Sequence, residues 1–179
     1  MIRTFKYVAL TTPGVPQPCF GTTTSAAIAP ASAGTNSQVS IPVTDSSFFQ
    51  PQDPVNVDVG VNEERTLVVS VPDGTHIVVA SLSKAHASGI FVRLTGPISA
   101  VYIQCIDGNT SAIFIGNKST MVKATGVGCI AKLQPVASGT QPIEFDSTIA
   151  GFPGPLSYGE LWFDGTTAGD KILPSASVD

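Results

Sequence analysis

Hydrophobic and polar residues alternate along much of this chain, which is the pattern of half-buried β-strands. The clearest case is a run of four valines at every second position from Val55 to Val61, separated by polar residues or glycine. A period of two places every second side chain on one face of a sheet. We therefore predict a strand over residues 55–62 with one buried face and one solvent-facing side.

Short apolar runs that end at turn residues predict further strands in the first half of the chain. These runs cover residues 39–43, 66–71, 76–82 and 90–94. Pro72-Asp73-Gly74 lies between two of them and is a hairpin signal, in which Gly74 can adopt a positive φ. Because the strands are short and closely spaced, we predict a small antiparallel β-barrel module over residues 39–95.

A second set of short apolar runs follows Thr95-Gly96-Pro97. Residues 98–106 are almost continuously apolar, which is typical of a central strand. Further strands are predicted over residues 111–115, 127–133, 143–145 and 160–164, and from residue 171 onward. Several short strands at this spacing predict a small β-sandwich or barrel module over residues 96–179.

Residues 1–38 differ from both modules. Residues 3–10 predict one strand, but the segment that follows is rich in Thr, Ala, Pro, Gly and Ser and has no sustained period. Between Leu10 and Ile41 there is no charged residue. A segment of this composition buries little on its own. We therefore predict an extended N-terminal arm over residues 1–38, which is held against a neighbouring molecule or, as the alternative, against its own domain.

Composition supports an all-β chain. Val, Ile and Thr number 51, whereas Leu, Met, Glu, Lys and Arg together number 23. β-Branched residues favour strands, and the second group contains most of the strong helix formers. We predict an all-β fold in which the extended arm is followed by a small antiparallel β-barrel and a small β-sandwich or barrel.

Charge and hydrophobicity exclude several function classes. The chain has 12% charged and 42% hydrophobic residues, which is the reverse of a disordered chain. Nine Lys and Arg against 13 Asp and Glu give no basic face for a nucleic acid. The uninterrupted apolar stretches are too short to span a membrane. We therefore expect neither a nucleic acid nor a membrane as a partner.

The reactive side chains form no recognisable catalytic or metal motif. Cys19, Cys105 and Cys129 are far apart and are expected to be buried free thiols. His76 and His86 lack a base or nucleophile at a known spacing, and the ring of His86 is expected to bond backbone carbonyls. We predict no catalytic residue, metal or cofactor, and a chain that is not an enzyme.

Residues 53–58 contain the kind of oxygen ligands that calcium binds. Asp53, Asn56 and Asp58 do not have the spacing of an EF-hand loop, and Pro54 interrupts the pattern. We predict a solvated strand face here.

Aromatic and apolar residues in Pro- and Gly-rich segments are the candidates for a partner interface. Large anchors of this kind contribute most of the binding energy in protein interfaces. Phe48, Phe49 and Trp162 are instead predicted to be core residues. The predicted interface consists of Phe5, Tyr7, Val15, Pro16, Phe20, Ile28 and Phe152.

Residues 39–94 resemble a small β module that recurs in phage virion proteins and surface proteins. The resemblance rests on VSIPVTDSSFFQPQDPVNVD, NEERTLVVSV and LSKAHASGIFV. That module combines a Phe-containing turn, a Gly-Asp turn, an acidic turn and a loop like KAHA-x-G. Here Gln52-Asp53-Pro54 replaces the Gly-Asp turn, which is a departure from the pattern.

Residues 101–173 resemble a second phage-associated pattern, through VYIQ, GNTSAIFIGN, GVGCIAKLQP and LWFDGTTAGDKI. Together the two resemblances imply a structural protein of a tailed-phage virion, of the capsid decoration (cement) type. Such a protein is made in the host cytoplasm, binds the major capsid protein on the outer capsid surface and stabilises the shell. The resemblance implies a homotrimer, with a dimer as the alternative, and it leaves residues 1–38 uncovered.

Two other functions stay open at this point. A tail or head-fibre module could recognise a host-surface glycan through a shallow aromatic site, for which Trp162 and Tyr158 are the candidates. An enzyme, for example a hydrolase, would have to use His86 or His76 as a base.

Overall fold

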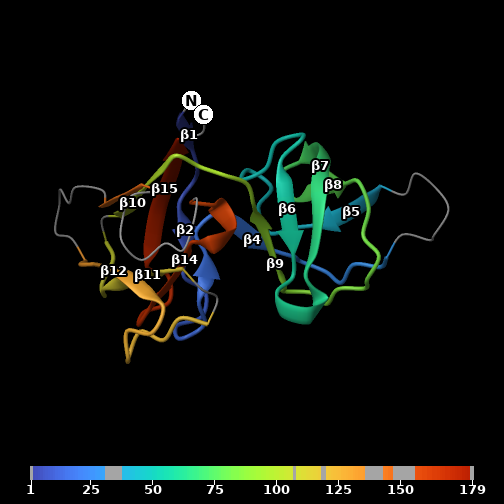
Figure 1. Cartoon of the computed structure of the whole chain (residues 1–179). Coiled ribbons are helices and arrows are strands. Elements are labelled where there is room, and N and C mark those ends of the chain that lie inside the picture. The colour runs from blue at the N-terminus through green and yellow to red at the C-terminus, as the bar shows by residue number, and fades with distance from the viewer. Residues whose placement is uncertain are drawn as a thin grey trace. The chain divides into compact units, whose positions relative to one another are not determined.

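Figure 1 shows the computed structural model, which describes residues 2–30, 38–106, 108–117, 120–135, 143–146 and 156–177. Its elements are β-strands and two short 3₁₀ helices, which confirms the all-β prediction. The chain divides into two compact units. Unit 1 consists of Met1–Phe20 together with Pro97–Asp179, and unit 2 consists of Gly21–Gly96.

Unit 1 contains two antiparallel sheets. We call the first the terminal sheet, because it contains the first and last strands of the chain as neighbours (Figure 1). Its strand order is β1 (Ile2–Thr4), β15 (Lys171–Ser177), β10 (Ala100–Cys105) and β13 (Ile143–Asp146), and β2 (Val8–Ala9) also pairs with β15. The second sheet has the order β12 (Cys129–Leu133), β11 (Ile113–Gly116), β14 (Trp162–Gly165) and β3 (Gln17–Pro18). The 3₁₀ helix η2 (Tyr158–Glu160) precedes β14.

All four residues of β14 are buried. In β10 the buried residues alternate with half-buried ones along the whole strand, as expected when one face packs on the core. Together with residues of β15 and β11 they form the core of this unit. Its fully buried members include Val101, Ile103, Ile113, Ile115, Ile172 and Ala176.

Unit 2 is one curved sheet of six antiparallel strands. Their order is β4 (Gly21–Thr23), β9 (Phe91–Leu94), β6 (Pro54–Val57), β7 (Glu64–Asp73), β8 (His76–Val79) and β5 (Val39–Pro42). The two end strands meet as well, because Thr24 bridges Val43 and the backbone N–H of Ser25 donates to the carbonyl of Pro42 at 3.0 Å. The sheet therefore curls back on itself as a small barrel around Val55, Val57, Val68, Ile77, Val79 and Val92.

The predicted arm over residues 1–38 is wrong for the part that the structure describes. Its first 20 residues belong to unit 1, where β1 and β2 pair with β15 and β3 pairs with β14. The residues that follow belong to unit 2, where β4 pairs with β9. The boundary predicted at residue 38 is therefore replaced by one at Phe20, whereas the boundary predicted at residue 95 lies within one residue of the observed one at Gly96. Residues 31–37 lie outside the described part of the chain.

The strand predicted over residues 55–62 from the valine alternation ends at Val57. Asp58 and Gly60 both adopt positive φ angles, of 72° and 68°, so the chain turns into the 3₁₀ helix η1 (Gly60–Asn62). Val61 consequently lies 94% exposed at the turn. The prediction fails here because residue type alone does not reveal a left-handed backbone. Gly74 also departs from expectation, since it closes the β7–β8 hairpin without a positive φ.

Gly116 marks a close approach of two backbone segments in unit 1. It lies at a register shift between β11 and β12, and a Cβ there would clash with the carbonyl oxygen of Gly128 and lie 2.5 Å from the sulfur of Met121. We expect Gly116→Ala to lower the free energy of unfolding by about 2 kcal/mol, because the backbone would have to move. Chemical denaturation measures this change.

The matched control for this substitution is Gly74→Ala. A Cβ at Gly74 meets no atom within 4 Å, and its φ is not in the left-handed region. This change should alter stability by less than about 0.5 kcal/mol. Equal effects of the two substitutions would show that the close approach at Gly116 is unimportant.

Candidate functional site

The structure divides the predicted interface residues into buried and exposed groups. Three of these residues are buried, namely Phe5, Phe20 and Ile28. The prediction that they contact a partner is wrong for Phe20 and Ile28, whose side chains lie in the interior of their units. Tyr7 and Val15 are exposed, and Pro16 is half-buried. Phe152 lies outside the described residues. The predicted set is therefore not one surface.

Phe5, Phe20 and Tyr158 form an aromatic cluster inside unit 1. Phe20 makes edge-to-face contacts with both other rings, at centroid distances of 5.1 Å to Phe5 and 4.9 Å to Tyr158. Such pairs stabilise a core beyond their buried area. Sequence reasoning placed Phe20 at an interface because its neighbours are Pro, Gly and Thr, but Phe20 lies in the bend between β3 and β4 and its ring is fully buried.

The aromatic residues proposed for a shallow glycan site are also buried. Trp162 and Tyr158 are each almost inaccessible, and the Trp162 Nε1–H donates to the carbonyl of Gly159 at 3.2 Å. Neither ring is available as a sugar platform, so this site prediction is wrong. The core predictions for Trp162, Phe48 and Phe49 are confirmed.

A groove of about 320 Å³ lies on the terminal sheet of unit 1. Tyr102 and Gln104 point into it from β10, and their cross-strand partners on β15 are Ser175 and Leu173. Ile2 is 66% exposed and Leu173 is 41% exposed, whereas Phe5 is buried beside them. The complete lining is Ile2, Thr4, Phe5, Tyr102, Gln104, Leu173, Pro174 and Ser175.

Positive side chains flank this groove where β1 and β2 run along β15. The guanidinium carbon of Arg3 lies 5.0 Å from the ring centroid of Phe5, and Lys171 Nζ lies 4.6 Å from that of Tyr7. Both are cation–π contacts. Lys6 is exposed between the two aromatic residues. On β13, Glu144 accepts a hydrogen bond from the Tyr102 hydroxyl at 3.0 Å. Arg3, Lys6 and Lys171 thus lie on or beside β1, β2 and β15, in a chain whose net charge is −4.

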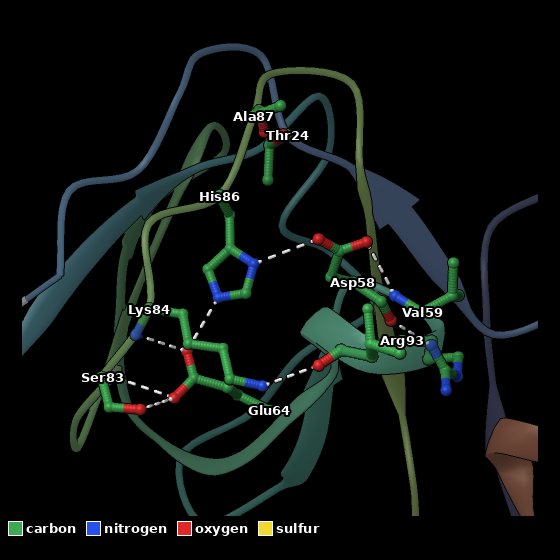
Figure 2. A network of polar contacts seen from close by, with 10 residues as sticks. Thr24, Asp58, Val59, Glu64, Ser83, Lys84, His86, Ala87 and Arg93 are labelled. Atoms are coloured by element: carbon green, nitrogen blue, oxygen red, sulfur yellow. Dashed lines mark hydrogen bonds and ion pairs between the residues drawn. The ribbon is translucent and has the colours of Figure 1, made fainter.

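A second feature is a buried polar network around His86 in unit 2 (Figure 2). The fully buried imidazole lies between two carboxylates, with Nδ1 3.2 Å from Asp58 Oδ2 and Nε2 2.9 Å from Glu64 Oε2. Ionised carboxylates only accept hydrogen bonds, so both contacts are satisfied when both ring nitrogens carry a proton. The prediction that this ring bonds backbone carbonyls is therefore wrong.

Glu64 holds the loop that contains His86. Its carboxylate accepts hydrogen bonds from the backbone N–H groups of Ser83 and Lys84, at 2.8 and 2.9 Å, and from the Ser83 hydroxyl. Burial by itself would raise the pKa of Glu64, but the hydrogen bonds from Ser83, His86 and Lys84 outweigh it and lower the pKa to about 2. The ionised carboxylate is thus the form that the fold stabilises.

Asp58 and Arg93 fix the adjoining turn. The Asp58 carboxylate accepts the backbone N–H of Val59 at 2.8 Å, which supports the positive φ of Asp58. Arg93 on β9 donates to the backbone oxygen of Asp58 at 2.6 Å and forms an ion pair with Glu63 at 2.5 Å. The same network therefore binds one loop and one turn to the barrel (Figure 2).

The predicted solvated face at residues 53–58 is wrong, since each of its polar side chains is engaged within the fold. Asp53 accepts the backbone N–H of Gln50, Asn56 donates to Glu63, and Asp58 faces His86. In the described part of the chain, no group of three or more His, Cys, Asp or Glu side chains is arranged to hold a metal ion.

The cysteine prediction is confirmed for Cys19 and Cys105, which are buried free thiols, whereas Cys129 is half-buried. Burial raises the pKa of the Cys19 thiol well above its ordinary value. Over the described ranges, no helix is long and apolar enough to cross a membrane.

Comparison with protein-family models, curated proteins and solved structures gives no match for this chain. The groove on the terminal sheet and the network around His86 are therefore the two features from which a function can be argued.

Proposed function

We propose that this chain is a structural protein of a tailed-phage virion that binds the capsid exterior and stabilises the assembled shell without catalysing a reaction. The observation that supports this proposal is the groove on the terminal sheet, with exposed Ile2 and Leu173 at its surface. Contiguous exposed apolar side chains around a concavity favour a protein partner. The partner that we propose is the major capsid protein.

The charges around the groove indicate what the capsid surface should offer. Arg3 lies over the ring of Phe5, which lines the groove, and Lys171 lies on β15, which also lines it, whereas the lining itself is uncharged. A complementary surface has an apolar protrusion for the groove and carboxylates near these basic side chains. Part of the affinity should therefore weaken as the salt concentration rises, since exposed charges are screened.

Stabilisation of the shell follows from mass action. A protein that binds the assembled lattice, but not its separate subunits, shifts the equilibrium towards the lattice. We propose a homotrimer at local three-fold positions, with a homodimer as the alternative, because capsid sites recur with the symmetry of the shell. Sedimentation of the purified protein measures its oligomeric state.

Leu173→Asp should weaken binding to capsid shells by at least about tenfold. Binding would remove water from the new carboxylate and bury it among the apolar side chains of the groove. The measurement is cosedimentation of the purified full-length variant with shells assembled from the major capsid protein of the same phage. Leu173 is exposed, so circular dichroism should show an unchanged β-sheet spectrum.

Leu67→Asp is the matched control. Leu67 is 46% exposed in β7 of unit 2, close to the 41% of Leu173, and it does not line the groove. This variant should bind shells as the wild type does. Equal binding by both variants would exclude the groove as the attachment site. If the wild-type protein does not bind shells but binds a glycan array, the proposed capsid function is wrong.

A further inference from the structure

The loop that contains His86 fastens a separate segment of the chain to the barrel of unit 2. We call residues 24–28 the strap and residues 83–89 the latch loop. Ile28 and His86 exchange two backbone hydrogen bonds, with N···O distances of 2.8 and 3.0 Å. At the other end of the strap, the Thr24 hydroxyl donates to the carbonyl of Ala87 and the Thr24 carbonyl accepts from Gly89 (Figure 2). The Ile28 end of the strap is therefore held by the latch loop, whereas its Thr24 end is also joined to the end of β5 through Val43 and Pro42.

The latch loop is itself held by charge. Its contacts to Glu64 and Asp58 are two backbone N–H groups, a serine hydroxyl and both nitrogens of the buried imidazole. Hydrogen bonds to an ionised carboxylate are about twice as strong as bonds between neutral groups. Protonation of Glu64 would weaken the hydrogen bonds that its carboxylate accepts from Ser83, Lys84 and the His86 ring. The barrel strands do not depend on these contacts, since they pair through their own backbones.

We propose that Glu64 and His86 form an acid-released latch, which holds the latch loop and the Ile28 end of the strap against the barrel while the Glu64 carboxylate is ionised and frees them when it is protonated. The barrel strands remain folded in the released state. The latch belongs to unit 2 and the groove to unit 1, so this proposal is independent of the proposed capsid attachment.

The direction of the pH effect follows from Glu64. Because the fold lowers its pKa from 4.5 to about 2, the ionised form stabilises the folded state. This stabilisation is complete above about pH 4.5 and is lost as the pH falls from there towards about 2. The other charged groups near the imidazole do not reverse the direction. Lys84 and Arg93 keep their charge in acid, and Glu63 pairs with Arg93 and not with the ring.

Amide hydrogen exchange of the full-length protein tests the latch. Protection factors, which are corrected for the intrinsic pH dependence of exchange, should fall at least about tenfold at Ile28 and His86 between about pH 6 and about pH 3. The paired amides of β7 and β8 should change less than about threefold over the same range. A parallel loss at all these amides, or no loss at Ile28 and His86, would overturn the proposal.

Two variants separate the latch from other acid effects. Glu64→Gln keeps the shape of the side chain but cannot ionise, so Ile28 and His86 should already be weakly protected at about pH 6, with no further fall in acid. Asp73→Asn is the control. The backbone N–H and hydroxyl of Thr75, followed by His76, lower the pKa of Asp73 to about 2, but this carboxylate lies in the β7–β8 hairpin turn. The Asp73→Asn protein should show the same acid-induced loss of protection at Ile28 and His86 as the wild type.

The opposite pattern of these variants, in which Glu64→Gln keeps the acid-induced fall or Asp73→Asn abolishes it, would contradict the latch. If Glu64→Gln does not fold, which circular dichroism detects, the comparison of strap and barrel amides within the wild type still decides the question.

Discussion

Phe20→Ala should lower the free energy of unfolding of unit 1 by about 3–5 kcal/mol, which is the usual cost of removing a fully buried ring. The ring has no exposed surface and packs between Phe5 and Tyr158, so its removal leaves a cavity that these neighbours cannot fill without moving. Chemical denaturation followed by tryptophan fluorescence measures the loss. Trp162 is the single tryptophan and lies in the same unit.

Tyr7→Ala provides the comparison for Phe20→Ala. Tyr7 is 55% exposed, so its truncation should cost less than about 1 kcal/mol. A Phe20→Ala protein of unchanged stability that fails to bind capsid shells would restore Phe20 as an interface residue and would contradict the core assignment.

His86→Ala should destabilise unit 2 by about 3–5 kcal/mol, because it removes a buried ring that contacts two partly buried carboxylates. Asp58 would lose its contact to the ring, Glu64 would lose one of the hydrogen bonds that it accepts, and the latch loop that bonds to Ile28 would be held less firmly. Chemical denaturation followed by far-ultraviolet circular dichroism measures the effect.

The other histidine gives a matched control for His86→Ala. His76 also lies 3.1 Å from a carboxylate, that of Asp73, but both side chains are largely exposed. Exposed ion pairs contribute about 0–1 kcal/mol, so His76→Ala should be nearly neutral. Equal losses in the two variants would mean that burial of the His86 network does not determine its contribution.

The longer strands could be predicted from the sequence because their signal is local. The hairpin of β7 and β8 and the central strand β10 lie where alternation and turn residues placed them. Of the strands in residues 2–23, only one strand over residues 3–10 was predicted, because each of them has only two or three residues and no period. They form because distant strands supply their hydrogen-bond partners, as when Ile2 pairs with Ser177.

The network around His86 was beyond sequence reasoning for a related reason. Its carboxylates lie 22 and 28 residues from the histidine, on a different strand and turn. Each acidic residue taken singly looks like an ordinary surface charge. The available signal was that segment 58–93 contains both acidic and basic residues. In the structure, acidic and basic members of this segment contact one another at one end of the barrel, namely Asp58, Glu63 and Glu64 with Lys84, His86 and Arg93.

The neutral stretch from Leu10 to Ile41 also has a simpler explanation than a partner. Where the structure describes it, its larger apolar side chains are mostly interior, including Leu10, Cys19, Phe20, Ile28 and Ile41. Charged side chains are disfavoured in a segment whose side chains enter first one core and then another, because burying an unpaired charge is costly. Short edge strands and bridges, and not a period, are its structural elements.

The pairing of β1 with β15 sets an order of events during synthesis. Unit 2 is complete in sequence once Gly96 has been made, and its contacts span fewer than 80 residues, so it can fold while the rest of the chain is still being translated. The terminal sheet of unit 1 cannot be completed at that stage, because β1 and β2 pair with β15, which lies far later in the chain. Unit 2 can therefore be complete while β1 and β2 still await their partner strand.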